Sequence, residues 1–236
     1  MGQMDGISDT EVKTKIVVVG DCGCGKTTMI KRYVSNTFVE AYTPTGFDTY
    51  NATYQASAAY KVHLSIWDTS GNSSYDRVRP VSYTGADLVL ACFSIVNPDS
   101  LHNIVTKWLP EIKEHCPTAP IIVVGLGSDL RTDEQTLAKL ARRNTTPITY
   151  EQGLKAAKDI DALVYSETSS KTSESSVRDV MEVAALSSMG TKARTAQASE
   201  SAEKRKSMKK KKTKSMGEAK DKIKTKKESD KGCSIM

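Results

Sequence analysis

The sequence predicts an α/β domain in which a six-stranded, mostly parallel sheet carries helices on both faces. Short β-branched runs alternate with segments of helical spacing over about 170 residues, which is typical of parallel strands joined by crossover helices. The composition agrees, since 38% of the 236 residues are hydrophobic and 26% are charged, as in one globular domain with some unfolded chain. Right-handed crossovers would gather the loops that follow the parallel strands at one edge, where such folds bind ligands.

Six segments have the composition of strands. The run KIVVVG ends at Gly20 and is typical of a buried strand. Two alternating segments, 49–56 and 60–68, are expected to pair as a hairpin through 57–59. The predicted sheet is completed by three further apolar runs, at 87–95, 119–126 and 162–167.

Segments of helical spacing separate these strands. In the first helix, which follows Gly25, the apolar side chains on one side are Met29, Ile30, Tyr33 and Val34. Further helices are predicted at 100–115, 134–143, 151–159 and 176–188.

Charge divides the chain into a domain and a tail. Residues 191–236 hold 16 of the 34 basic and 6 of the 28 acidic residues, so the net charge of +6 comes from this segment. Beyond Met189 the apolar periodicity stops, and so polar a segment cannot bury enough surface to fold. We therefore predict a flexible N-terminus at 1–12, a globular domain at 13–189 and a disordered basic tail at 190–236. The globular part is net acidic, which argues against nucleic-acid binding.

The five cysteines are predicted to be reduced thiols of a cytosolic protein. Cys22 and Cys24 are too close together for the usual metal-binding spacing, and no second Cys or His pair accompanies them. Cys92 lies in an apolar run and is expected in the core.

The segment GDCGCGKT, residues 20–27, predicts a site for the phosphates of a nucleotide. Its glycines let the backbone curl so that successive N–H groups, together with a helix N-terminus, surround the phosphates. Lys26 would bind the β- and γ-phosphates, and the Thr27 hydroxyl would bind Mg²⁺. A glycine-rich turn that merely caps a helix is the alternative. The predicted nucleotide-binding residues of this segment are Gly20, Asp21, Cys22, Gly23, Cys24, Gly25, Lys26, Thr27 and Thr28.

Further loops carry polar residues that suit the same site. In WDTSG, Asp68 suits a Mg²⁺ partner through water, and the Gly71 N–H suits the γ-phosphate. Thr45 would complete the metal shell, although taken alone it is only a loop threonine. The ends of two more strands are followed by Asp129 and by the group Ser169, Ser170 and Lys171.

With these motifs in place, the chain resembles a small GTPase of the Rho family in the Ras superfamily. The likeness covers about residues 13–188 and is carried by YTPTGFDTY, DTSGNSSYDRVRPVSY and DLRTDEQTLAKLARRNTTPITYEQG. The resemblance implies a P-loop NTPase G domain with a Rho-type helical insert at about 131–147, which binds GTP and Mg²⁺ as a monomer. It also implies effector binding through switch I, Pro44 to Tyr50, and through switch II, and it adds Phe38 and Tyr42 as nucleotide contacts.

Within the Rho family the chain most resembles the Rnd subgroup, which holds GTP without appreciable hydrolysis. Family members that hydrolyse GTP usually have glycine at the position of Cys22, where a side chain would crowd the γ-phosphate and block an arginine finger. The catalytic glutamine aligns with Asn72, whose shorter side chain would miss the attacking water. Positioning and charge supply nearly all of the catalysis in phosphoryl transfer, so very slow turnover is expected.

The base-binding box departs from the family as well. The N-K-x-D pattern reads Leu126-Gly127-Ser128-Asp129, which leaves Asp129 to accept hydrogen bonds from guanine. The missing Asn and Lys would each cost roughly 1 kcal/mol or more, so weaker binding and faster exchange are expected. Phe38, which resembles the aromatic side chain packed against guanine, would partly offset this loss.

The tail ends in CSIM, which fits a prenylation box in which Cys233 is modified, with farnesyl favoured by the final methionine. One lipid chain anchors only marginally, and the basic run 204–215 would add attraction to an anionic membrane. We expect a location on the cytoplasmic face of the plasma membrane or endomembranes, with a cytosolic pool. A nuclear-localisation signal or a simply solvated charge run is the alternative. Phosphorylation of Ser207 and Ser215 is expected to weaken membrane attachment.

These observations predict a Rho-like protein that stays loaded with GTP, is tethered to a membrane and binds effectors. A role in actin organisation follows only from the resemblance. A slow GTPase that needs an accessory protein and a nucleotide-free scaffold remain as alternatives. The retained ligand-type residues argue against the scaffold; they are Lys26, Thr27, Thr45, Asp68 and Asp129.

Overall fold

The computed structural model describes residues 10–40, 43–57 and 60–190, which belong to the first of the two units of the chain, Met1–Thr191. Six strands form one sheet: β1 (Thr10–Gly20), β2 (Phe47–Ser57), β3 (Tyr60–Thr69), β4 (Leu88–Ser94), β5 (Ile121–Leu126) and β6 (Val164–Thr168). Their order is β2-β3-β1-β4-β5-β6, and the β2–β3 pair is antiparallel while the other pairs are parallel. The predicted six-stranded, mostly parallel sheet is confirmed.

Helices follow the strands much as predicted. They are α1 (Lys26–Ser35), α2 (Pro80–Tyr83), α3 (Pro98–Asn103), α4 (Leu109–His115), α5 (Glu134–Ala141), α6 (Tyr150–Asp159) and a last helix at 174–190. Short 3-10 turns are present at Ser73–Tyr75 (η1) and Ser128–Arg131 (η3).

The segment predicted as one helix at 100–115 is interrupted by a π-helical turn, η2 (Ile104–Trp108), between α3 and α4. The backbone N–H of Leu109 donates to the Ile104 carbonyl, five residues back. Pro110 supplies a physical reason, because it has no N–H to donate to the carbonyl four residues before it.

Strand β1 begins before the predicted boundary. Residues 10–12, which the sequence assigned to a flexible N-terminus, pair with β3, where Thr10 lies opposite Tyr60. Strand β4 joins the other side of β1 only from Ile16 onward. The first half of β1 therefore has a single neighbour and a polar composition, which is why its strand character is weak in the sequence.

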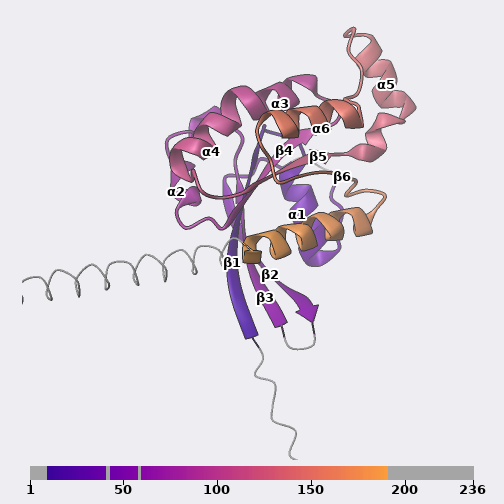
Figure 1. Cartoon of the computed structure of the whole chain (residues 1–236). Coiled ribbons are helices and arrows are strands. Elements are labelled where there is room, and N and C mark those ends of the chain that lie inside the picture. The colour runs from indigo at the N-terminus through magenta and orange to yellow at the C-terminus, as the bar shows by residue number, and fades with distance from the viewer. Residues whose placement is uncertain (1–9, 41–42, 58–59, 191–236) are drawn as a thin grey trace, which may run out of the picture. The chain divides into compact units, whose positions relative to one another are not determined.

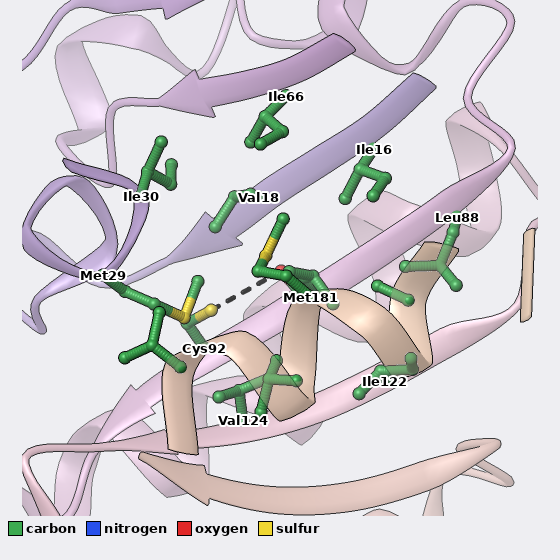
Figure 2. Packing of buried hydrophobic residues seen from close by; sticks show 14 of the residues in the cluster. Ile16, Val18, Met29, Ile30, Ile66, Leu88, Cys92, Ile122, Val124 and Met181 are labelled. Atoms are coloured by element: carbon green, nitrogen blue, oxygen red, sulfur yellow. Dashed lines mark hydrogen bonds between the residues drawn. The ribbon is translucent and has the colours of Figure 1, made fainter. Parts of the chain in front are cut away.

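Two apolar layers pack against the two faces of the sheet, because successive side chains of β1 point to opposite sides. Ile16 and Val18 face α1 and the last helix (Figure 1), and Figure 2 shows this layer with Met181 of the last helix inside it. Val17 and Val19 face the opposite layer, which includes Trp108 of η2 and side chains of α2, α4 and α6.

The predicted insert contains the helix α5, and Arg131 links the two ends of the insert to each other and to the domain. Arg131 forms two hydrogen bonds with the Glu167 carboxylate, at 2.7 and 2.8 Å. The same guanidinium donates to the Ile148 carbonyl, at 3.0 and 3.1 Å, on the far side of the insert.

Several predictions concern residues that the structure does not describe. These are the N-terminus up to residue 9, Tyr42, the hairpin turn at 58–59, and the tail with Ser207, Ser215 and Cys233. Among the described residues, no helix combines the length and the apolar character that crossing a membrane requires.

Candidate nucleotide site

The phosphate loop lies between the end of β1 and the start of α1, at the edge where the parallel strands end. Gly20 has φ 144°, and a Cβ there would lie 2.1 Å from the Cys92 carbonyl oxygen of β4. Gly25 has φ 110° and forms the N-cap of α1. Both positions favour glycine for backbone reasons, so the glycines of the motif are needed for the path of the loop.

Lys26 is buried and its ammonium group lies within the phosphate loop. Its Nζ donates to the carbonyl oxygens of Gly20 and Asp21, each at 2.8 Å. The lysine that the motif assigns to the phosphates is therefore held at the loop by the loop's own backbone.

The three residues predicted to hold Mg²⁺ lie together. The Thr27 hydroxyl donates to Asp68 Oδ2 at 2.6 Å and lies 2.7 Å from the Thr45 hydroxyl. Asp68 is buried, and within the described part of the chain its Oδ1 has no hydrogen-bond partner. Converging hydroxyl and carboxylate oxygens, one of them unsatisfied, suit a small hard cation.

The environment of the Asp68 carboxyl also suits a cation. Burial raises the pKa of the Asp68 carboxyl above its usual range, while the hydrogen bond from Thr27 and the charge of Lys26 oppose that rise. A bound divalent cation would stabilise the ionised form that burial disfavours. No group of three or more His, Cys, Asp or Glu side chains suited to a metal occurs among the described residues, so this metal would depend on hydroxyl oxygens.

A cavity of about 190 Å³ opens beside the phosphate loop. Eight residues predicted to bind nucleotide line it: Cys22, Gly23, Gly25, Lys26, Thr27, Thr28, Thr45 and Gly71. It also includes residues that the sequence did not indicate: Lys31, Val39, Glu40, Thr43, Thr69 and Ser70. Lys31 was detectable, because it lies one helical turn after Thr27 and so on the same face of α1.

The backbone of Gly71 lies directly against the backbone of the phosphate loop. A Cβ at this position would lie 2.3 Å from the Gly20 carbonyl oxygen and 2.4 Å from the Cys22 nitrogen. Switch II, here the segment 70–83 after β3, therefore begins in direct contact with the backbone of the phosphate loop.

The two positions expected to impair hydrolysis are both at the surface. Cys22 is exposed and lines the cavity. Asn72 is also exposed, and its side-chain oxygen accepts a hydrogen bond from the Ser74 N–H at 2.9 Å, which caps the η1 turn. The Asn72 carboxamide is thus used by its own turn.

Asp129 and Ser169, two of the residues predicted to hold the base, form a hydrogen-bonded pair outside the cavity. The Ser169 hydroxyl donates to Asp129 Oδ1 at 2.6 Å, and Ser169 Oγ in turn accepts from Thr172. Lys171 forms an ion pair with Glu40 at 3.3 Å. None of Asp129, Ser169, Ser170 or Lys171 lines the cavity beside the phosphate loop, and Phe38 is exposed on the surface.

Leu126 connects this cluster to the phosphate loop. A Cβ on Gly25 would contact Leu126 Cδ1 at 3.5 Å, so an apolar side chain lies where the family pattern has an asparagine that bonds to the loop. Gly127 has φ 78° and begins η3, which carries Asp129. Packing therefore replaces a hydrogen bond at this point.

Two predicted nucleotide contacts have side chains engaged elsewhere. The Asp21 carboxylate accepts hydrogen bonds from Asn103 and Trp108, on the side of η2. Cys24 is buried, with its thiol 3.8 Å from the Cys92 carbonyl oxygen, and burial raises the pKa of the Cys24 thiol. Any contact of these residues with phosphate would use their backbone. Cys92 is in the core, as predicted.

Comparison with known proteins agrees with this geometry. Residues 15–188 match the model of the Ras family. The chain is 46% identical over 166 residues to proteins named "Rho-related GTP-binding protein RhoE" from Homo sapiens, Mus musculus and Sus scrofa. The match covers 70% of this chain and 68% of each relative. Ras-family domains in general bind a guanine nucleotide with Mg²⁺, and the chain is accordingly a member of the Ras family, a Rho-related small GTPase of the Rnd kind.

Proposed function

We propose that this protein holds GTP, hydrolyses it very slowly and presents its switch regions to effectors as a persistently loaded signalling module. The observation that carries the proposal is the Asn72 carboxamide, which caps η1 through the Ser74 N–H. That bond directs the Asn72 oxygen toward its own turn, and the side chain is shorter than that of a catalytic glutamine, so both features disfavour contact with an attacking water.

Cys22 supports the same conclusion from the other side of the cavity. Its side chain is exposed beside Lys26 and Gly71, in the space that an arginine finger from an activating protein would enter. Such an arginine contributes roughly 10³–10⁵-fold to turnover. Excluding the arginine finger and replacing the catalytic glutamine by Asn72 together favour retention of GTP. The oxygens of Thr27, Thr45 and Asp68 still converge as Mg²⁺ binding would require.

The exposed apolar side chains of the two switches support a role in binding effectors. Phe47 of switch I packs edge-to-face on Tyr75 of switch II, with ring centroids 5.5 Å apart. Val78 and Val81 of switch II are 51% and 70% exposed. Exposed apolar side chains that gather on two contacting segments are typical of a surface that binds another protein. Actin organisation as the outcome is inferred from the resemblance to Rho proteins.

A membrane tether is the part of the proposal that depends on sequence alone. Cys233 would carry a prenyl group, and the basic run 204–215 would supply the second attraction that a single lipid chain needs. This arrangement would hold the domain at the cytoplasmic face of a membrane. Partition of the full chain between vesicles with and without anionic lipid, before and after Cys233→Ser, tests both parts.

The experiment that tests slow hydrolysis is a single-turnover measurement on the domain loaded with GTP and Mg²⁺. We expect GTP to persist for hours in the unchanged protein. Cys22→Gly together with Asn72→Gln should speed hydrolysis in the presence of an activating protein, whereas the matched surface change Ser74→Ala should not. Rapid hydrolysis by the unchanged protein would refute the proposal and favour the regulated GTPase.

A second candidate, a scaffold without nucleotide, is favoured by one observation. Leu126 and Gly127 replace the polar residues of the base-binding box, and Leu126 lies against Gly25 of the phosphate loop. Isothermal titration with GTP and Mg²⁺ distinguishes the candidates. Binding in the micromolar range or tighter excludes the scaffold, and the absence of binding at millimolar GTP excludes the loaded module.

A further inference from the structure

The carboxylate of Asp21, in the middle of the phosphate loop, is bound entirely from outside the nucleotide cavity. Its Oδ2 accepts from Asn103 Nδ2 at 2.7 Å, and its Oδ1 accepts from Trp108 Nε1 at 2.8 Å. Both donors come from one short segment, the end of α3 and η2. Hydrogen bonds to an ionised acceptor are about twice as strong as neutral ones.

The π-helical turn explains how two side chains five residues apart reach one carboxylate. On an α-helix, residues five apart project roughly 140° away from each other. The i→i+5 bonding of Ile104–Trp108 widens the turn and brings Asn103 and Trp108 to the same side. Pro110, by leaving a carbonyl one turn earlier without its usual donor, helps to fix the widened turn at this place.

Trp108 is packed in the core and against a charged side chain. It is fully buried, and the Arg79 guanidinium lies over its ring at 4.6 Å from the centroid. Arg79 is also buried and donates to the Ser70 carbonyl at 2.9 Å, at the start of switch II. The indole therefore connects the phosphate loop, through Asp21, with the backbone of Ser70, which lines the cavity.

We propose that Asn103 and Trp108 are positioning residues of the phosphate loop, and that the π-helical turn exists to aim their two donors at Asp21. Through the Asp21 carboxylate they hold the loop in its phosphate-binding conformation from the side away from the cavity. They do not touch nucleotide, but they slow its release. In a chain whose base-binding box lacks its usual Asn and Lys, this support from behind offsets part of the lost retention. The inference requires nucleotide binding and is independent of the rate of hydrolysis.

An exchange of the two side chains tests the proposal. Asn103→Asp places a carboxylate against Asp21 and should speed the release of methylanthraniloyl-GDP, at fixed Mg²⁺, by about tenfold or more. Asp21→Asn should speed release in the same direction. In the double variant Asp21→Asn/Asn103→Asp the amide and the carboxylate change places, and the side chain at position 21 can still accept the hydrogen bond from Trp108 Nε1. Release of nucleotide should then return to within about threefold of the rate of the unchanged protein.

Thr106→Ala is the matched control, because Thr106 lies in the same turn and its hydroxyl donates only to the His102 carbonyl. It should leave release unchanged. Trp108→Phe keeps an aromatic ring but removes the indole donor, and it should speed release as the other single variants do. Circular dichroism establishes that each variant is folded.

A second measurement does not need nucleotide. Amide hydrogen exchange across residues 20–25 of the nucleotide-free protein should be faster in Asn103→Asp and in Asp21→Asn, and it should slow again in the double variant. The proposal is overturned if the single variants release nucleotide and exchange amides at the unchanged rate. It is equally overturned if the double variant releases nucleotide as fast as Asn103→Asp does. Swapping the two side chains would not repair a purely local structural effect.

Discussion

Removing the buried guanidinium of switch II should be one of the costliest single changes in the domain. Arg79 is 0% exposed and donates to both carboxylate oxygens of Glu111 (2.6 and 2.5 Å), to Asp76 (2.5 Å) and to the Ser70 carbonyl (2.9 Å). The Glu111 carboxylate is only 15% exposed and also accepts from the Tyr83 hydroxyl at 2.6 Å. Arg79→Met leaves that carboxylate buried without its counter-charge, a situation that costs about 3–5 kcal/mol.

The free energy of unfolding, from urea denaturation at fixed nucleotide and Mg²⁺ concentrations, measures this cost. A second change, Glu111→Gln, removes the orphaned charge, so Arg79→Met/Glu111→Gln should lose less than the two single changes added together. Lys155→Met is the control, since it breaks the exposed ion pair with Asp159 and should barely move the midpoint. Two results would contradict this expectation. One is a loss of unfolding free energy in Arg79→Met no larger than that in Lys155→Met, and the other is a loss in Arg79→Met/Glu111→Gln equal to the sum of the losses in the two single variants.

Three further predictions follow from the site. Gly71→Ala should weaken nucleotide binding by about a hundredfold in a titration, because its Cβ would lie 2.3 Å from the Gly20 carbonyl oxygen and neither backbone can yield cheaply; unchanged affinity would contradict the close approach. Asp68→Asn should raise the melting temperature of the protein without Mg²⁺, since it removes a buried charge whose Oδ1 has no hydrogen-bond partner among the described residues, yet abolish the effect of Mg²⁺ on nucleotide release; a retained Mg²⁺ effect would exclude this residue from the metal site. Burial raises the pKa of Cys116 to about 11, so iodoacetamide should spare Cys116 at pH 8 and label it only as the pH approaches 11. The exposed Cys22 should be modified at pH 8. Peptide mass spectrometry measures the labelling of both cysteines.

The parts of the site that depend on local sequence were predictable. The phosphate loop is a contiguous motif whose glycines are required by the backbone, as Gly20 and Gly25 confirm. The grouping of Thr27 with Asp68 was also predictable, because strand order and crossover handedness bring the ends of parallel strands to one edge. Thr45 lies in the loop before the antiparallel strand β2, so this argument does not place it.

The parts that depend on distant neighbours were not predictable. Asp21 was expected to contact nucleotide, but its carboxylate binds donors 82 and 87 residues away, and no local pattern gives their direction. The widened turn at Ile104–Trp108 was predicted as ordinary helix, since its apolar spacing is compatible with either geometry. The start of β1 at Thr10 was missed because TEVKT has one neighbouring strand and a polar composition.

The most direct test of the central claim is the identity of the nucleotide carried by the purified domain, determined by chromatography after denaturation and repeated after several hours at 25 °C with Mg²⁺. We expect GTP at both times, because Asn72 caps its own turn and the exposed Cys22 lines the cavity. GDP at the first time, or GTP converted to GDP by the last, would contradict it and would establish a chain that still hydrolyses.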